Sequence, residues 1–131
     1  MKNGKEECIG QITVIVIDDS LVVRQQVRNM LMEHENVEVV GEADDIAVGL
    51  SMIIEHNPNY VVLDISMPKG SGFQLLEYLK SKNIRSKVIM LTNYSEVCYR
   101  NQAEILGADY FFDKSNEFDK VLQVICQHSH I

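Results

Sequence analysis

Cysteine and proline are scarce in this sequence of 131 residues, and acidic side chains outnumber basic ones. The three cysteines, Cys8, Cys98 and Cys126, are odd in number and widely separated, which argues against a disulfide framework or a zinc site. Two prolines and 46% hydrophobic residues indicate a globular chain rather than a disordered one. The net charge of −7 argues against direct binding of nucleic acid and favours basic partners or cations.

Long apolar runs are also missing. Residues 1–10 are polar and charged without an apolar core, so they do not resemble a signal peptide, and no segment reaches membrane-spanning length. We therefore expect a cytoplasmic protein that does not enter a membrane. Its length fits one domain, residues 1–131 with a core at about 12–127.

Apolar runs of strand length alternate with amphipathic helical patterns along the chain. This alternation predicts an α/β fold in which a five-stranded parallel sheet carries helices on both faces. Glu38 interrupts the second run, which suggests an edge strand, and the strand order 2-1-3-4-5 is taken from flavodoxin-like folds. The fourth helix has only a thin apolar face. Strands are expected at 12–17, 37–40, 60–64, 87–91 and 110–112, and helices at about 21–33, 45–56, 73–81, 95–106 and 118–125.

Polar side chains follow four of the predicted strands. Asp18 and Asp19 follow the first strand, Asp64 the third, Thr92 the fourth and Lys114 the fifth. A single polar residue at a strand end is an ordinary turn former. However, the carboxyl ends of parallel strands open on the same side of a sheet, so we expect all these groups in one cleft.

Three carboxylates in one cleft require compensation, because two of them about 4 Å apart repel by roughly 4 kcal/mol at an effective dielectric near 20. A divalent cation supplies it, and hard oxygen ligands favour Mg²⁺, with Mn²⁺ as the alternative. Such a partly filled coordination shell points to a phosphate ligand. Asp64 is then the candidate nucleophile for an aspartyl-phosphate, while Lys114 neutralises charge and Thr92 donates its hydroxyl to a phosphoryl oxygen.

The same residues lie in motifs that resemble a known family, the receiver domain of two-component response regulators, similar to the chemotaxis response regulator. The resemblance covers residues 12–127. Its motifs, in chain order, are Ile17-Asp18-Asp19-Ser20, Asp64-Ile65-Ser66-Met67-Pro68 with Gly72, Met90-Leu91-Thr92-Asn93, Gly107-Ala108-Asp109 and Asp113-Lys114.

The resemblance implies that Asp64 accepts a phosphoryl group from a sensor histidine kinase or a phosphotransfer protein. It implies that Asp19, Asp64 and the Ser66 carbonyl bind Mg²⁺ with the assistance of Asp18, and that Lys114 binds the phosphoryl group. The domain would be a signalling module, not an enzyme.

The resemblance also implies that Thr92 and Phe111 act as switch residues. They would control the face built from the fourth helix, the fifth strand and the fifth helix, which serves the family as an output surface or a homodimer interface. The downstream target is expected to be a protein, with no direct DNA binding.

Three positions bear on how closely the chain follows this pattern. Ser115 stands where the family usually has proline after the lysine, as in receivers that carry helix-turn-helix output domains. Asn93 replaces the usual alanine after the switch threonine. Ser66 and Tyr94 occupy the positions that tune phosphate lifetime in the family.

Alternative functions fit the residues less well. An aspartyl-phosphate phosphatase of the haloacid dehalogenase class needs a second Asp where Ser66 stands, and it carries a cap domain. A flavodoxin-like FMN binder needs a Ser/Thr/Gly phosphate loop where the chain has Asp18 and Asp19. A receiver that docks partners without phosphorylation would not need the intact acids, Thr92 and Lys114. The start at Met1 and the ending at 128–131 favour a stand-alone receiver over a piece of a longer protein.

Overall fold

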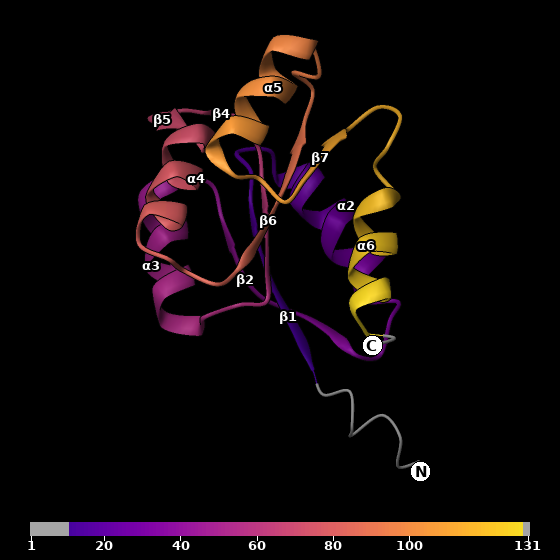
Figure 1. Cartoon of the computed structure of the whole chain (residues 1–131). Coiled ribbons are helices and arrows are strands. Elements are labelled where there is room, and N and C mark those ends of the chain that lie inside the picture. The colour runs from indigo at the N-terminus through magenta and orange to yellow at the C-terminus, as the bar shows by residue number, and fades with distance from the viewer. Residues whose placement is uncertain (1–10, 130–131) are drawn as a thin grey trace.

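A parallel sheet forms the centre of the computed structural model, which describes residues 11–129 (Figure 1). Its strands pair in the order β2-β1-β3-β6-β7, and every neighbouring pair is parallel. The predicted order 2-1-3-4-5 is therefore confirmed, with β6 and β7 as the fourth and fifth strands. The strands are β1 (Ile12–Ile17), β2 (Val37–Ala43), β3 (Tyr60–Leu63), β6 (Lys87–Thr92) and β7 (Tyr110–Asp113).

Helices cover both faces of the sheet, as predicted. In Figure 1 the helices α3 and α4 lie to the left of the strands, and α2 and α6 lie to the right. Alternate residues of β1 enter opposite apolar clusters: Ile15 and Ile17 pack with α3 and α4, whereas Val14 and Val16 pack with α2 and α6. The helices are α2 (Leu21–Leu31), α3 (Ile46–His56), α4 (Gly72–Ser81), α5 (Val97–Leu106) and α6 (Lys120–Ser129).

The strand at the centre of the sheet is buried along its length, and the edge strand is not. All four residues of β3 are buried, while Glu38 of β2 is exposed, which agrees with the edge position expected from this charge. The strand β2 runs on to Ala43, beyond the predicted end at residue 40, because its pairing with β1 continues to Ile17.

A short antiparallel hairpin follows the third strand, in a segment expected only to turn. Its strands β4 (Ser66–Met67) and β5 (Gly70–Ser71) pair Ser66 with Ser71 and Met67 with Gly70. Strands of two residues carry no periodic pattern that the sequence could have shown. The last helix begins at Lys120, so the expectation that Phe118 lies on it is wrong, although Phe118 still packs against the cluster around α6.

None of the helices in the described stretch is both long and apolar enough to cross a membrane. Cys98 and Cys126 are free thiols, and Cys8 lies outside the described residues. Helix α5 buries only Ala103 completely, which confirms its thin apolar face.

Candidate functional site

Two buried carboxylates follow adjacent central strands. The N–H of Asp18 donates to the carbonyl of Ala43 at 3.0 Å, and the N–H of Asp64 donates to the carbonyl of Ile17 at 3.2 Å. These bonds extend the sheet by one residue and fix the two acids side by side. Carboxylate oxygens of Asp18, Asp19 and Asp64 lie within 4.8 Å of one another. The structure thus brings together the three acids that the sequence analysis selected.

Lys114 bridges the two buried acids. Its Nζ lies 2.8 Å from Asp18 Oδ2 and 2.9 Å from Asp64 Oδ2, and its own N–H donates to the carbonyl of Thr92 at 3.0 Å. Burial alone would lower the pKa of Lys114, but the hydrogen bonds to Asp18 and Asp64 outweigh it and raise the pKa above its ordinary value. The ammonium therefore stays charged between the carboxylates.

Asp18 is the most enclosed of the acids, with 3% of its surface exposed. Burial raises the pKa of its carboxyl group, and the hydrogen bonds from Lys114 and from the N–H of Ser20 offset this only in part. Asp19 next to it is exposed. The cluster therefore combines one desolvated carboxylate with one that faces solvent, so a cation can reach it from outside.

Gly72 allows helix α4 to begin directly against Asp64. A Cβ atom at residue 72 would collide with the carbonyl oxygen of Asp64, and the Gly72 N–H donates to the Ile65 carbonyl at 2.7 Å. The carboxylate of Asp64 is held by the N–H of Ile65, 2.7 Å from Oδ1. In the sequence Gly72 stands out only as part of a family motif, so this close approach was not predicted.

Thr92 is the last residue of β6, and Ser66 begins the hairpin two residues after Asp64. Thr92 is fully buried, and its Oγ1 accepts a hydrogen bond from the N–H of Tyr94 at 3.1 Å. Ser66, in the hairpin, is exposed. An open pocket of about 310 Å³ separates the hairpin from the start of α5, lined by Ile65, Ser66, Gly70, Ser71, Tyr94 and Tyr99.

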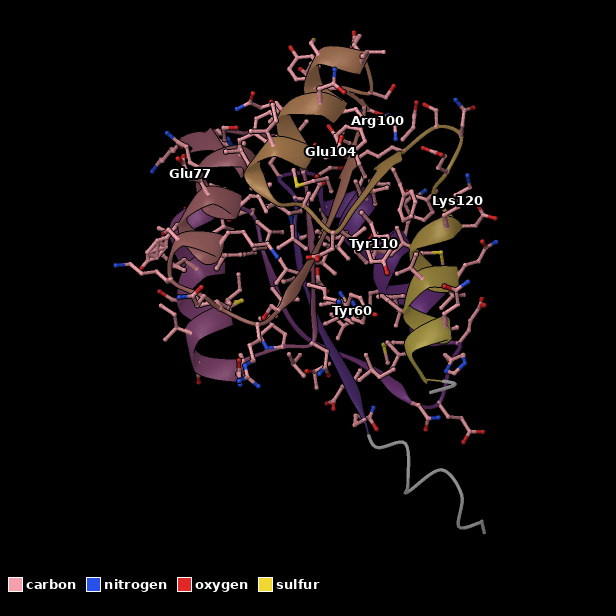
Figure 2. All side chains as sticks on the ribbon, viewed as in Figure 1. Tyr60, Glu77, Arg100, Glu104, Tyr110 and Lys120 are labelled. Atoms are coloured by element: carbon pink, nitrogen blue, oxygen red, sulfur yellow. The ribbon has the colours of Figure 1, made fainter. Side chains whose placement is uncertain are left out.

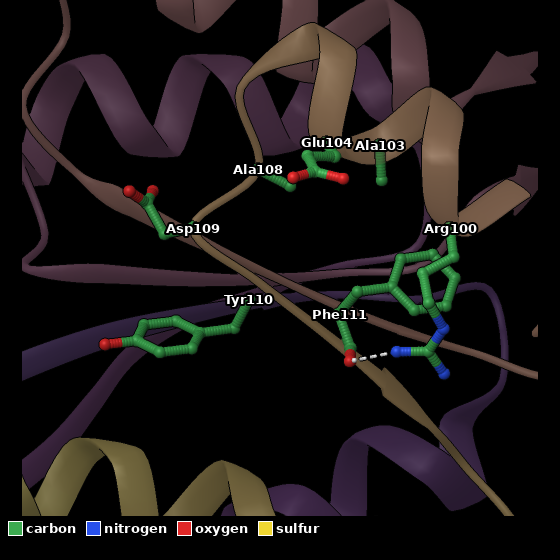
Figure 3. Close-up of a pocket in the computed structure, with 7 residues that line it drawn as sticks. All are labelled: Arg100, Ala103, Glu104, Ala108, Asp109, Tyr110 and Phe111. Carbon is green, nitrogen blue, oxygen red and sulfur yellow. Dashed lines mark hydrogen bonds between the residues drawn. The ribbon is translucent and has the colours of Figure 1, made fainter.

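Phe111 belongs to β7 and contacts helix α5 through Arg100. The guanidinium of Arg100 stacks over its ring at 4.6 Å, and Arg100 Nη1 donates to the Phe111 carbonyl at 3.2 Å (Figure 3). Tyr110 points the other way, toward α6 (Figure 2). A pocket of about 260 Å³ between α5 and β7 is lined by Arg100, Ala103, Glu104, Ala108, Asp109, Tyr110 and Phe111.

Residues 14–126 match the family model of the response regulator receiver domain. This chain belongs to that family. A receiver domain is the signalling module of a two-component system. The domain itself is typically not an enzyme, and its partner is generally a histidine kinase. Receivers generally bind Mg²⁺ in an acidic pocket, and three Asp residues are clustered in this chain.

Relatives of this receiver belong to longer proteins with different names. It is 37% identical over 109 residues to BvgA of Bordetella pertussis, which is named as a transcription regulator of virulence factors. The match covers 83% of this chain and 52% of BvgA. It is 33% identical to a protein-glutamate methylesterase/protein-glutamine glutaminase of Methanospirillum hungatei, covering 86% and 34%. The chain thus spans about half the length of BvgA.

Solved structures agree with the fold. The signal receiver domain of the response regulator NarL from Mycobacterium tuberculosis superposes with a TM-score of 0.85 at 29% identity, over 92% of this receiver and 98% of that chain. The response regulator domain of Thermotoga maritima CheB gives 0.82 at 26% identity, over 92% and 98%. By name the first is a signal receiver domain and the second a response regulator domain.

Proposed function

We propose that this receiver is a single phosphoryl-accepting domain in a two-component phosphorelay, with Asp64 as the acceptor. One observation carries the proposal. The Lys114 ammonium lies within 2.9 Å of both Asp18 and Asp64, so a fixed positive charge stands beside a carboxylate that is 6% exposed. A phosphoryl group transferred to Asp64 would bring further negative charge next to the Lys114 ammonium, which would stabilise it.

The acceptor step is a displacement at phosphorus. A carboxylate oxygen of Asp64 forms a new P–O bond while the P–N bond of a phosphohistidine breaks, and the imidazole leaves with the electron pair. Each oxygen of Asp64 accepts a hydrogen bond, from Ile65 N–H or Lys114, and keeps a further lone pair. These bonds orient the nucleophile before the donor arrives.

The donor set fits Mg²⁺, because it consists of hard carboxylate oxygens within 4.8 Å of one another. Asp18, Asp19 and Asp64 would hold the ion, and the resemblance adds the carbonyl of Ser66. Once bound, Mg²⁺ would neutralise part of the charge on the transferring phosphoryl oxygens. Mn²⁺ has the same preference for oxygen ligands and would substitute.

Phosphorylation would be reported through Thr92 and Phe111. The Thr92 hydroxyl oxygen accepts a hydrogen bond from the N–H of Tyr94, in the loop that leads into α5. If this hydroxyl rotates to donate to a phosphoryl oxygen, its bond with Tyr94 changes and the loop is perturbed. Phe111 lies under Arg100 of α5, and movement of α5 would release its ring. The output face is then α5, β7 and α6, for a target protein or a second copy of the chain, and not for DNA.

Intact mass after acetyl phosphate treatment tests the acceptor assignment. We expect a gain of one phosphoryl group that requires Mg²⁺ and is lost in Asp64→Asn, which keeps the size of the side chain. Because Asp18 and Asp19 remain in that variant, it still carries two of the three acids. Labelling that persists in Asp64→Asn would refute the assignment.

A further inference from the structure

Arg24 lies directly behind the acidic turn, in the first part of helix α2. Its Nη1 donates to the backbone carbonyl of Asp18 at 2.6 Å, and its Nε donates to Glu42 Oε1 at 3.2 Å. The Arg24 side chain is 14% exposed and that of Glu42 is 19% exposed. A guanidinium this enclosed, with two fixed partners, holds one geometry.

Glu42 is held in turn from two sides. Its Oε2 lies 2.7 Å from Arg28 Nε, one helical turn after Arg24. Glu42 belongs to β2, and the carbonyl of the following residue, Ala43, accepts a hydrogen bond from the N–H of Asp18. Strand β2 therefore supports the acidic turn by a direct backbone bond and, through Glu42, by the Arg24 guanidinium.

The backbone of Asp18 is thus fixed at both of its polar groups. Its N–H is bound by Ala43, its carbonyl by Arg24, and its Oδ1 accepts the N–H of Ser20 at 2.9 Å. The carbonyl of residue 18 belongs to the peptide plane that leads into Asp19. Anchoring this plane fixes the backbone from which the exposed Asp19 side chain extends. A carboxylate that binds a cation must be held at a defined position, so this anchor bears on cation binding.

We propose that Arg24 is a positioning residue for the cation site, acting through the Asp18–Asp19 peptide and supported by Glu42. The inference rests on the proposed function, since it assumes that these acids bind Mg²⁺. Arg24 binds the carbonyl of Asp18 and not its carboxylate, so it acts on the ligands and does not touch the ion.

The electrostatic effect of Arg24 has the opposite sign to its positioning effect. A positive charge close to the acids repels a cation, so its removal by charge alone would tighten Mg²⁺ binding. Loss of an anchor for the ligands would weaken Mg²⁺ binding, typically by 10- to 100-fold for groups that orient metal ligands. The direction of the change therefore separates the two roles.

The test is the Mg²⁺ dissociation constant, measured by ¹H–¹⁵N NMR titration with MgCl₂ on the folded protein. We expect Arg24→Gln to weaken binding about 10-fold or more. Arg24→Lys keeps the charge but loses the planar fork, so it should weaken binding as well. Glu42→Gln, which removes the counterion of Arg24, should give a smaller loss.

Ser86→Ala is the matched control for stability. Ser86 is buried, and its hydroxyl donates to the Pro58 carbonyl at 2.6 Å. Ser86 precedes β6 and Pro58 precedes β3, so both lie at the amino ends of these strands, whereas the acids follow the carboxyl ends. Ser86→Ala should lower the free energy of unfolding without changing the Mg²⁺ dissociation constant. A merely structural Arg24 would behave in the same way.

Unchanged or tighter Mg²⁺ binding in folded Arg24→Gln would overturn the inference and leave the proposed function standing. So would an equal loss of affinity in Ser86→Ala. If the wild type neither binds Mg²⁺ nor accepts phosphate from acetyl phosphate, the proposed function fails, and the inference fails with it.

Discussion

The acid cluster and the α5–β7 face differ in how firmly the chain holds them. Asp18 and Asp64 are 3% and 6% exposed and follow strands at the centre of the sheet, and Thr92, the last residue of β6, is 0% exposed. On α5, by contrast, Val97 is 71% and Ile105 77% exposed.

Under the proposed function, this difference separates two tasks in one small domain. Groups that react must be held still, which the central strands achieve through backbone bonds. A helix that must shift its position needs few buried contacts, because local opening costs least where little apolar surface is packed. The contrast predicts that equivalent changes in the two regions have unequal effects.

Removal of the lysine that pairs with an aspartate of each region should give the largest difference. Lys114→Met leaves Asp18 and Asp64 facing each other without a counter-charge, and we expect it to cost about 3 kcal/mol or more of unfolding free energy at pH 7 and to abolish labelling by acetyl phosphate. Lys80→Met breaks a 3.0 Å ion pair with Asp109 whose side chains are 31% and 27% exposed. It should cost less than about 1 kcal/mol and leave labelling intact.

Urea unfolding and intact mass measure both quantities. Equal losses of stability in the two lysine variants would show that the acid cluster depends on the Lys114 ammonium no more than Asp109 depends on that of Lys80.

A methyl group added to a glycine in each region should have a smaller but still unequal effect. Gly72→Ala forces α4 away from the Asp64 carbonyl, and we expect a loss of about 1–3 kcal/mol in stability together with slower labelling. Gly107→Ala places a side chain at φ 99° at the end of α5, which costs about 1 kcal/mol. Labelling rates at saturating acetyl phosphate should be unchanged in Gly107→Ala. If both variants slow labelling alike, the close contact at Gly72 has no bearing on the acceptor.

The smallest effect is expected at Glu117, which lies 3.5 Å from Arg100 on the α5–β7 side. A hydrogen bond from the Asp113 N–H, with a further one from Lys120, holds the pKa of Glu117 below its ordinary value of 4.5. A lowered carboxyl pKa contributes stability above that ordinary value, and the contribution disappears as pH falls through the lowered pKa.

Glu117→Gln should therefore be slightly less stable than the wild type above pH 4.5, and the two should converge at lower pH. Urea unfolding midpoints between pH 7 and pH 3 test this. A difference that stays constant down to pH 3 would mean that the charge of Glu117 contributes nothing.

The sequence was sufficient for the sheet and for the meeting of the acids. Buried strands carry continuous apolar runs, and the polar residues at their carboxyl ends meet because parallel strands share one edge. Asp18, Asp64 and Lys114 could therefore be grouped without coordinates. Their chemical roles stay predictions until labelling is measured.

Other features depend on three-dimensional contacts that no local pattern records. The β4–β5 hairpin is too short for periodicity, and Phe118 shares the spacing of the last helix without belonging to it. The reach of Arg24 to the Asp18 carbonyl depends on the direction of a long side chain. The collision that makes Gly72 necessary becomes visible only when α4 is placed against β3.

The bridge from Lys114 to Asp18 joins the residue after the last strand to the residue after the first. A nascent chain that has emerged from the ribosome only as far as β6 already contains all three acids but lacks the ammonium that separates two of them. The cluster of Asp18, Asp64 and Lys114 is therefore complete only after the last strand has docked. Under the proposed function, competence to accept a phosphoryl group at Asp64 would in this way be tied to the completion of folding.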